Sequence, residues 1–434
     1  MTPTRRLLLS SLVLASSLLM GAPAIAQEKS QPREGANQER PLSELEKRLD
    51  RFSKQWRAEF GIERSLALGQ IRGMAGKQPP APDWTPRVAG KGRLERGPGG
   101  VPILYLNGTP EEMGAQHGTL LKNEISALRS YVRAFVGPRR IKQSTKDAAA
   151  LFSEHLPQRY LREAAALAKA VEMPLDELLF AQWFTDLYRS FACSAISAPQ
   201  GKNTGPFLAR NLDFPTLGYL QRYSIVVVAR PAGQEPFVAI GWPGLLGVLS
   251  GQNKGVALGV LVVHDSRGAR SGLPFQFALR RALEETTTSE GVEKLLRQTP
   301  LTVTNNLALV DRSGDARVLE LDPTGIGSRR CEGRPLTVTN HFESPDRRAP
   351  RLSFSYLSST SRLRKIRRRC PSSEARPSLA QARKGLAEAG VSFTAQSMIF
   401  LPKTGELEVA FTTRGSAAKG TFVRIGRELL LGKE

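Results

Sequence analysis

Residues 192–213 read ACSAISAPQGKNTGPFLARNLD, and they place a cysteine at one end and an arginine with an aspartate at the other. Two short apolar runs lie between these residues, Ser194–Ala198 and Pro206–Arg210. The residues that join the runs are rich in glycine and asparagine. Apolar runs joined in this way are typical of a β-hairpin, so the stretch predicts two antiparallel strands.

Such a hairpin would bring Arg210 and Asp213 back beside Cys193. A thiol becomes a strong nucleophile only when a base or a positive charge helps it to lose its proton. The pattern therefore makes Cys193 a candidate nucleophile. The alternative is a buried structural cysteine next to a surface ion pair, since buried reduced cysteines are common.

The first 26 residues have the pattern of a secretory signal peptide. Arg5 and Arg6 give a charged start, Leu7–Leu19 is apolar, and Ala24-Ile25-Ala26 matches a cleavage site. No later stretch approaches the ~18 apolar residues that a membrane helix needs. We therefore expect an exported protein, periplasmic or extracellular, with no stable membrane anchor after removal of the signal. An uncleaved N-terminal anchor is the alternative.

Export changes how the three cysteines are interpreted. In an oxidising compartment Cys331 and Cys370 are a candidate disulfide, which leaves Cys193 with a reactive thiol. Three reduced, buried thiols are the alternative.

The formal net charge is +22, but the basic residues are spread out except in Arg362–Arg369. The spacing of that run predicts an amphipathic helix. No zinc-finger spacing, RNA-recognition motif or aromatic interleaving accompanies the charge, so we expect no nucleic-acid partner. The four histidines show no metal-ligand spacing, and we expect no metal and no cofactor. His341 is an alternative base for Cys193, whereas His117 fits a core histidine on a helix.

The composition divides the chain into four parts. Residues 1–26 are the signal peptide, 27–96 a polar arm or linker, 97–192 a helical segment, and 193–434 a β-rich catalytic segment. In the helical segment Thr109-Pro110-Glu111-Glu112 predicts a helix start, since threonine caps and a glutamate follows three residues later.

That first helix is expected to reach Val136, with further helices over about 145–171 and 174–189. Strands and grouped helices after Cys193 predict an α+β layered domain. The expected strands are Val101–Leu106, Tyr223–Arg230, Phe237–Ile240, Gly255–Val263, Asn306–Asp311, Val318–Leu321, Leu336–Asn340, Gln396–Leu401, Glu406–Thr412 and Gly420–Ile425. The expected helices among them are Phe275–Thr286, Ser289–Gln298, Ser361–Arg369 and Leu379–Ala389.

A cysteine without a histidine partner needs another base. A free α-amino group, with a pKa near ~7.7–8.0, would serve if the chain is cut between Ala192 and Cys193. Such a site also needs donors for the oxyanion, and asparagine amides suit this role. Asn253 and Asn340 stand at predicted strand ends and are the candidates; the alternative for each is a turn residue.

Together these residues resemble the cysteine N-terminal-nucleophile hydrolases of the isopenicillin N acyltransferase type. That family is related to bile salt hydrolases, acid ceramidase and N-acylethanolamine acid amidase. The matching stretches, in order over roughly 100–425, are Gly108–Gly114, Gln116–Gly118, Cys193-Ser194, Arg210–Asp213, Asn253–Gly255, Thr339–Phe342, Ser358–Arg362 and Gln396–Met398 with Pro402.

The resemblance implies a role for each residue. Cys193 would be both the self-cleavage nucleophile and the catalytic thiol. Arg210 and Asp213 would position and charge-balance its thiolate and α-amine. Asn340, with Asn253, would hold the oxyanion. Arg362 would support the site; its alternative is a solvated charge on a helix face.

The fold that the resemblance implies is a four-layer αββα sandwich with a helical N-terminal segment. The activity is that of an amidase or acyltransferase, acting on a linear, non-peptide acyl amide through an acyl-thioester on Cys193. After self-cleavage, residues 97–192 and 193–434 would stay associated as two chains. The rivals are a bile-salt-type or lactone hydrolase on the same scaffold and a non-catalytic exported binding protein.

Overall fold

A computed structural model gives the structure of the chain from residue 79 onward. The signal peptide predicted at 1–26, and residues 27–78 of the predicted arm, lie outside the described residues. The described residues are 79–187, 192–214, 219–263, 270–345, 347, 354–371, 373, 375–413 and 415–432.

The predicted hairpin is confirmed as strands β4 (Ala192–Gly201) and β5 (Gly205–Asp213), which pair antiparallel. Asn203 and Gly205 in the connection have φ values of 64° and 74°. Asparagine and glycine adopt this left-handed conformation more readily than other residues do, so the sequence favours a turn here.

The hairpin lies within a six-stranded sheet of order β13-β4-β5-β14-β15-β16. The four other strands come from distant parts of the chain: β13 (Leu336–Val338), β14 (Thr394–Leu401), β15 (Glu406–Ala410) and β16 (Val423–Ile425).

A second, ten-stranded sheet has the order β1-β2-β3-β6-β7-β8-β9-β10-β11-β12. Strands β3 and β6 are parallel, whereas the other neighbouring strands of this sheet are antiparallel. The strands are β1 (Arg87–Ala89), β2 (Gly92–Arg96), β3 (Pro102–Gly108), β6 (Ile225–Pro231), β7 (Phe237–Gly241), β8 (Ser250–Asn253), β9 (Val256–Val262), β10 (Asn305–Asp311), β11 (Ala316–Asp322) and β12 (Gly325–Arg330).

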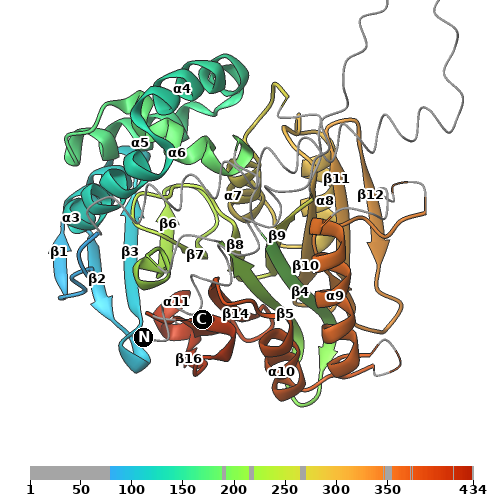
Figure 1. Ribbon diagram of the computed structural model, residues 1–434. Coiled ribbons are helices and arrows are strands. Elements are labelled where there is room, and N and C mark those ends of the chain that lie inside the picture. The colour runs from blue at the N-terminus through green and yellow to red at the C-terminus, as the bar shows by residue number, and fades with distance from the viewer. Residues whose placement is uncertain are drawn as a thin grey trace, which may run out of the picture. The chain divides into compact units, whose positions relative to one another are not determined.

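The two sheets pack face to face, with β4 and β5 against β9 and β10 (Figure 1). Helices α7 (Phe275–Glu285) and α8 (Ser289–Arg297) cover the outer face of the ten-stranded sheet. Helices α9 (Phe354–Arg369) and α10 (Leu379–Ala389) cover the outer face of the six-stranded sheet. The predicted α+β class and four-layer αββα arrangement are therefore confirmed.

Alternation along β4 explains why this sheet is buried on both sides. Cys193 and Ala195 belong to the large core between the sheets, whereas Ile196 and Ala198 belong to a smaller core beneath α9 and α10. Side chains in a strand point alternately to opposite faces, so Cys193 faces the other sheet.

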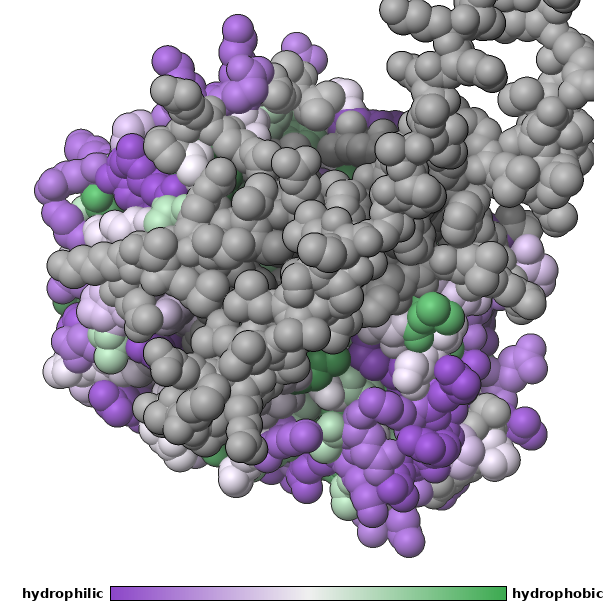
Figure 2. Space-filling model, viewed as in Figure 1, coloured by the Kyte–Doolittle hydropathy of each residue, from purple (hydrophilic) through white to green (hydrophobic). Residues whose placement is uncertain are grey.

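Helix α9 shows the predicted amphipathic pattern. Arg362 and Ile366 are buried, whereas Arg364, Arg367 and Arg368 are exposed. Figure 2 shows hydrophilic residues over α9 and α10 at the lower right of the molecule. The predicted solvated alternative for Arg362 is therefore wrong, because its side chain points inward.

Among the described residues before Cys193 lie the helices α3 (Pro110–Val136), α4 (Pro138–Phe152), α5 (Gln158–Ala170) and α6 (Leu175–Leu187). The start and end predicted for the first helix are confirmed. The Glu112 N–H donates to Thr109 Oγ1 at 3.2 Å, and the Thr109 N–H donates to Glu112 Oε2 at 2.7 Å. The helix predicted over 145–171 is instead divided, with Pro157 at the cap of α5.

Two expectations are corrected. The predicted polar arm 27–96 ends earlier, because 87–96 forms the edge hairpin β1–β2, in which Leu94 is buried. The candidate disulfide is wrong, because Cys331 and Cys370 are not joined. The Cys331 thiol lies against the Arg334 carbonyl, whereas Cys370 is buried in the core beneath α9 and α10.

Within the part of the chain that the structure describes, no helix is both long and apolar enough to span a membrane.

Candidate active site

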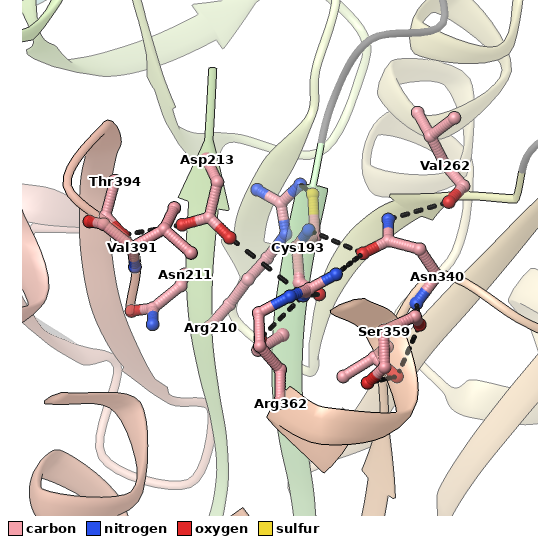
Figure 3. A network of polar contacts seen from close by, with 12 residues as sticks. Cys193, Arg210, Asn211, Asp213, Val262, Asn340, Ser359, Arg362, Val391 and Thr394 are labelled. Atoms are coloured by element: carbon pink, nitrogen blue, oxygen red, sulfur yellow. Dashed lines mark hydrogen bonds and ion pairs between the residues drawn. The ribbon is translucent and has the colours of Figure 1, made fainter. Parts of the chain in front are cut away.

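The hairpin places a guanidinium directly beside the Cys193 thiol. Arg210 Nη2 donates to Cys193 Sγ at 3.4 Å, and both side chains are 1% exposed. Further Arg210 bonds to Ser250 Oγ and the Val260 carbonyl fix the guanidinium across the two sheets. The structure thus places Arg210 beside Cys193, as the hairpin predicts (Figure 3).

Asp213 lies opposite Ala192 in the strand pairing, one residue from Cys193. Its Oδ1 accepts a hydrogen bond from Thr394 Oγ1 at 2.6 Å, and its Oδ2 lies 4.0 Å from Arg362 Nη1. Burial raises the pKa of Asp213 to about 6, although Arg362, Thr394 and Arg210 each act to lower it. The buried carboxyl group therefore keeps its proton to a higher pH than an ordinary aspartate does.

Asn340 and Arg362 complete the cluster from the opposite side (Figure 3). Asn340 Oδ1 accepts hydrogen bonds from the Cys193 backbone N–H and from Arg362 Nη2, both at 2.8 Å. Arg362 also donates to the Cys193 carbonyl and, at 3.1 Å, to Ser194 Oγ. The backbone of Cys193 is therefore held on both its N–H and its carbonyl side.

A hydrogen bond from the amide nitrogen, Nδ2, fixes the orientation of the Asn340 side chain. Asn340 Nδ2 donates to the Val262 carbonyl at 2.7 Å, and the Asn340 N–H donates to Ser359 Oγ at 2.8 Å. An amide nitrogen carries two hydrogens, so one bond to Val262 uses only half of its donor capacity.

The surroundings of the Cys193 thiol favour its neutral form. Burial raises the pKa of Cys193, and the Asp213 carboxylate raises it further, whereas Arg210 and Arg362 act in the opposite direction. Burial also lowers the pKa of both arginines. Activation of the thiol therefore requires a base or a better-solvated state of this cluster.

Asn253 does not join the cluster. Its Nδ2 donates to the carbonyls of Leu283 and Thr286, and its Oδ1 accepts the N–H groups of Gly255 and Val256. The two Nδ2 bonds tie the end of β8 to the end of α7, and the two Oδ1 bonds hold the turn into β9, so the amide has no donor left for an oxyanion. The predicted catalytic role is corrected to the turn role that was its alternative.

His341 and His117 form hydrogen bonds with groups other than the Cys193 thiol. His341 contacts Ser359 Oγ through Nδ1 at 2.7 Å and packs edge-on against Tyr356, and burial lowers its pKa. His117 is buried, its Nε2 accepts the Gly244 N–H at 2.9 Å, and its pKa is lowered to about 4. His117 is thus the core histidine that its helix position predicts.

Sequence reasoning missed three polar residues of the site. Ser250 and Thr394 hold Arg210 and Asp213, and Ser359 holds the Asn340 backbone. Ser359 lies in a stretch that carries the family resemblance, but lone serines and threonines gave no signal for the other two. Among the described residues no group of His, Cys, Asp and Glu side chains could hold a metal ion.

The structure also contains an apolar cavity of about 150 Å³. Its walls include Leu128 from α3, Leu178 from α6, Trp242, Phe214 and Leu249. Phe214 directly follows Asp213 in the chain, and Leu249 directly precedes Ser250, the partner of Arg210. The cavity wall therefore includes the chain neighbours of Asp213 and Ser250.

The raised pKa of Asp213 predicts a pH-dependent gain in stability for Asp213→Asn. Between pH 4 and 6 the folded carboxyl holds a proton that the unfolded one has lost, so wild-type stability falls as pH rises through this window. Asparagine keeps the Thr394 bond without the buried charge. We expect its advantage to grow by up to ~3 kcal/mol from pH 4 to pH 7, since one pKa unit is about 1.4 kcal/mol.

Melting temperatures of both proteins across this range check the expectation. A difference between the two that does not change with pH would contradict it.

One family model and two proteins of known sequence are similar to this chain. The family model described as acyl-coenzyme A:6-aminopenicillanic acid acyl-transferase matches residues 200–389. The acyl-coenzyme A:6-aminopenicillanic-acid-acyltransferase 40 kDa form of Emericella nidulans is 25% identical over 252 residues, which is 55% of this chain and 68% of the relative. Protein dcd1B of Dictyostelium discoideum is 25% identical over 214 residues, 42% of this chain and 43% of that protein.

Among solved structures, the N-acylethanolamine-hydrolyzing acid amidase ortholog of Caenorhabditis elegans aligns with a TM-score of 0.40 and 15% identity, over 49% of this chain and 93% of that one. A variant of the conjugated bile acid hydrolase of Clostridium perfringens aligns with a TM-score of 0.37 and 12% identity, over 56% and 95%.

Proposed function

Because this chain is homologous to the acyl-coenzyme A:6-aminopenicillanic acid acyltransferase family, as its sequence predicts, we propose that it is a self-cleaving amidase or acyltransferase. One observation carries the proposal. The Cys193 thiol lies 3.4 Å from Arg210, while the backbone nitrogen of the same residue lies 2.8 Å from Asn340 Oδ1. Thiol and nitrogen of one residue are thus held in a single buried polar cluster.

Self-cleavage would begin with attack of the Cys193 sulfur on the Ala192 carbonyl carbon. The C–N bond between the two residues breaks, and the nitrogen takes the proton that the thiol has lost. Water then hydrolyses the thioester, which leaves a carboxylate on Ala192 and returns a proton to the sulfur. The products are a free Cys193 α-amine and a free thiol.

The freed α-amine would supply the missing base. Its ordinary pKa of ~7.7–8.0 suits proton exchange with a thiol near neutral pH. Asn340 Oδ1, which accepts from the backbone N–H in the uncut chain, would accept from the amine and hold it. Arg210 would stabilise the thiolate, and Asp213 and Arg362 would balance the charge of the amine and thiolate.

Turnover on a substrate would follow the same chemistry. The thiolate attacks the acyl carbonyl of a linear amide, and the leaving amine takes a proton from the Cys193 α-ammonium group. Water or an acceptor amine then attacks the thioester and releases the acyl group. The second Nδ2 hydrogen of Asn340 is the donor that would stabilise the oxyanion in both steps.

The cavity supports a hydrophobic acyl group. Leu128, Leu178, Phe214, Trp242 and Leu249 contribute to an almost entirely apolar wall, and Phe214 directly follows Asp213 in the chain. Each methylene moved from water into such a wall contributes about 0.8 kcal/mol. The acyl chain would occupy this cavity, with the scissile carbonyl at Cys193.

Export and lasting association of the two chains complete the proposal. The leader at 1–26 supports a periplasmic or extracellular location. Strand β3 pairs with β6 across the proposed cut, and Glu163 forms a buried ion pair with Arg280 at 2.6 Å. These contacts would keep residues before and after the cut together.

A bile-salt-type or lactone hydrolase would use the same cluster and differ in the group that the cavity accepts. A non-catalytic binding protein would have no need for self-cleavage. A panel of amides with acyl chains of increasing length, plus a conjugated bile salt and a lactone, separates these functions on purified, processed protein. Hydrolysis of the amides supports the proposal, whereas turnover of the bile salt or lactone alone would replace it.

Leu128→Trp is expected to change acyl preference within that panel. The larger side chain fills the cavity, so kcat/KM for long acyl chains should fall about tenfold or more while that for short chains stays within threefold, since one methylene in a pocket is worth about 1–3 kcal/mol. Leu429→Trp, on the exposed surface of α11 (Arg427–Leu430), is the matched control. Equal loss for all chain lengths would rule out an acyl site in this cavity.

A further inference from the structure

The end of helix α6 contains a buried carboxylate that the proposed chemistry does not use. Asp186 is 1% exposed and lies one residue before the last residue of α6, Leu187. Its Oδ2 accepts the Phe275 N–H at 3.3 Å and the hydroxyl of Thr302. Both donors belong to the segment that follows the proposed cut. Asp186 therefore ties the two segments together, and it precedes Ala192 by six positions in the sequence.

The residues that bind Asp186 belong to two stretches of the catalytic segment, and these stretches are hydrogen-bonded to each other. Leu273 and Leu301 form a β-bridge, and the Leu273 N–H donates to the Pro300 carbonyl at 3.0 Å. The Arg270 N–H donates to the Thr302 carbonyl at 2.8 Å. The start of α7 and the stretch around Thr302 are thus held as one unit.

A second contact lies one helical turn earlier on α6. Gln182 Oε1 accepts the Leu246 N–H, and its Nε2 donates to the Gly244 carbonyl, both at 2.8 Å. Residues four apart share one face of a helix, so Gln182 and Asp186 present that face to the catalytic segment. The last turns of α6 are consequently fixed in both position and rotation.

Six residues, 187–192, connect Asp186 to Cys193. The far end of this connection is fixed too, because Ala192 pairs with Asp213 in the sheet. Attack on a carbonyl demands close alignment of the reacting atoms, and a displacement of about 1 Å can cost ~10²-fold in rate. Holding the chain on both sides of the Ala192 carbonyl would reduce the conformations open to it.

We propose that Asp186, held by Thr302, is a positioning residue for self-cleavage, because it fixes the end of α6 from which the chain runs to the Ala192–Cys193 bond. This inference rests on the proposed self-cleavage. It assigns to Asp186 a role in maturation and none in later turnover, since the cut separates the chain upstream from the nucleophile.

Thr302→Val and Thr302→Ser test the proposal in the full chain. Valine has nearly the shape of threonine and lacks the hydroxyl, whereas serine keeps it. Pulse-labelled full-length protein is followed after synthesis, and the cut fraction is measured against time. We expect Thr302→Val to slow cutting at least tenfold, Thr302→Ser to restore the rate to within threefold of wild type, and Asp186→Asn to give an intermediate rate.

Two further measurements separate positioning from general stability. Turnover per titrated Cys193 thiol, in the fraction that is eventually cut, should stay within about threefold of wild type. Melting temperatures in a Cys193→Ala background, where every variant stays uncut, should remain within a few degrees. Asp176→Asn, the same kind of change at an exposed position of α6, is the matched control and should cut at the wild-type rate.

Wild-type cutting rates in Thr302→Val and Asp186→Asn would overturn the inference. Parallel losses of cutting, turnover and melting temperature would also overturn it, in favour of a purely structural contact. A wild-type chain that never cuts would instead refute the proposed self-cleavage, whatever the variants do.

Discussion

Replacing Cys193 by alanine is expected to leave the chain uncut and to lower acyl-amide turnover on the order of 10⁶-fold, as loss of the nucleophile does in other covalent hydrolases. The same sulfur would perform both reactions, so both should be lost together. Cys193→Ser keeps a weaker nucleophile and should give a slow or partial cut. Loss of one function without the other would show that different groups perform them.

The surroundings of Cys193 make this substitution a clean test. The Cys193 thiol accepts a hydrogen bond from Arg210 Nη2, and the backbone bonds of Cys193 to Asn340 and Arg362 do not depend on the thiol. Alanine should therefore leave the hairpin intact, and the melting temperature serves as the control. Collapse of the fold in Cys193→Ala would indicate a structural cysteine.

The second large effect is expected for Asn340→Ala. Removing one oxyanion donor typically lowers turnover by ~10²–10³-fold. The variant is made in protein that needs no maturation, by co-expression of residues 27–192 and 193–434 as separate chains. Turnover should fall by that factor, with little change in KM and with intact labelling of Cys193 by a thiol reagent.

Asn253→Ala is the matched control for Asn340→Ala, since both residues are buried asparagines that bond to backbone carbonyls. Asn253 has all its bonds at the end of β8 and in α7, so its loss should lower stability and leave turnover per folded molecule within threefold. A fall of less than threefold for Asn340→Ala would show that the oxyanion donor lies elsewhere.

The parts of the site that local sequence determines could be predicted. The hairpin follows from two apolar runs and an Asn-Gly-rich connection, and its register alone brings Arg210 and Asp213 to Cys193. Asn340 and Arg362 lie far from Cys193 in the sequence. A strand-end position made Asn340 one of two candidate oxyanion donors, whereas the role of Arg362 follows only from the family resemblance. No periodicity places a residue of α9 against β4.

The errors have physical causes. The edge strand β1 and its neighbour β2 bury few side chains, so their charged sequence resembles that of a linker. The disulfide between Cys331 and Cys370 is predicted because export favours disulfides. Whether two cysteines can bond depends on the distance between them in the fold, which the sequence does not give. Asn253 and Asn340 both lie near strand ends. Only their hydrogen-bond partners in the fold show that Asn253 is a turn residue and that Asn340 lies beside Cys193.

Thr394 and Ser250 are site residues that no sequence pattern identifies. Each makes a single hydrogen bond across strands to a charged residue of the cluster, Asp213 and Arg210 respectively. Hydroxyl residues are common in strands, and their importance here depends on the pairing of β14 with β5 and on the packing of one sheet against the other.

The central claim is that Cys193 becomes an N-terminal residue, and the intact masses of purified wild-type protein together with N-terminal sequencing test it most directly. The account predicts two chains that remain together under native conditions. The second should begin at Cys193, and the two masses should add up to the uncut chain plus one water. A protein that stays a single chain and is nevertheless fully active on acyl amides would contradict the account, because no α-amine would then exist at Cys193.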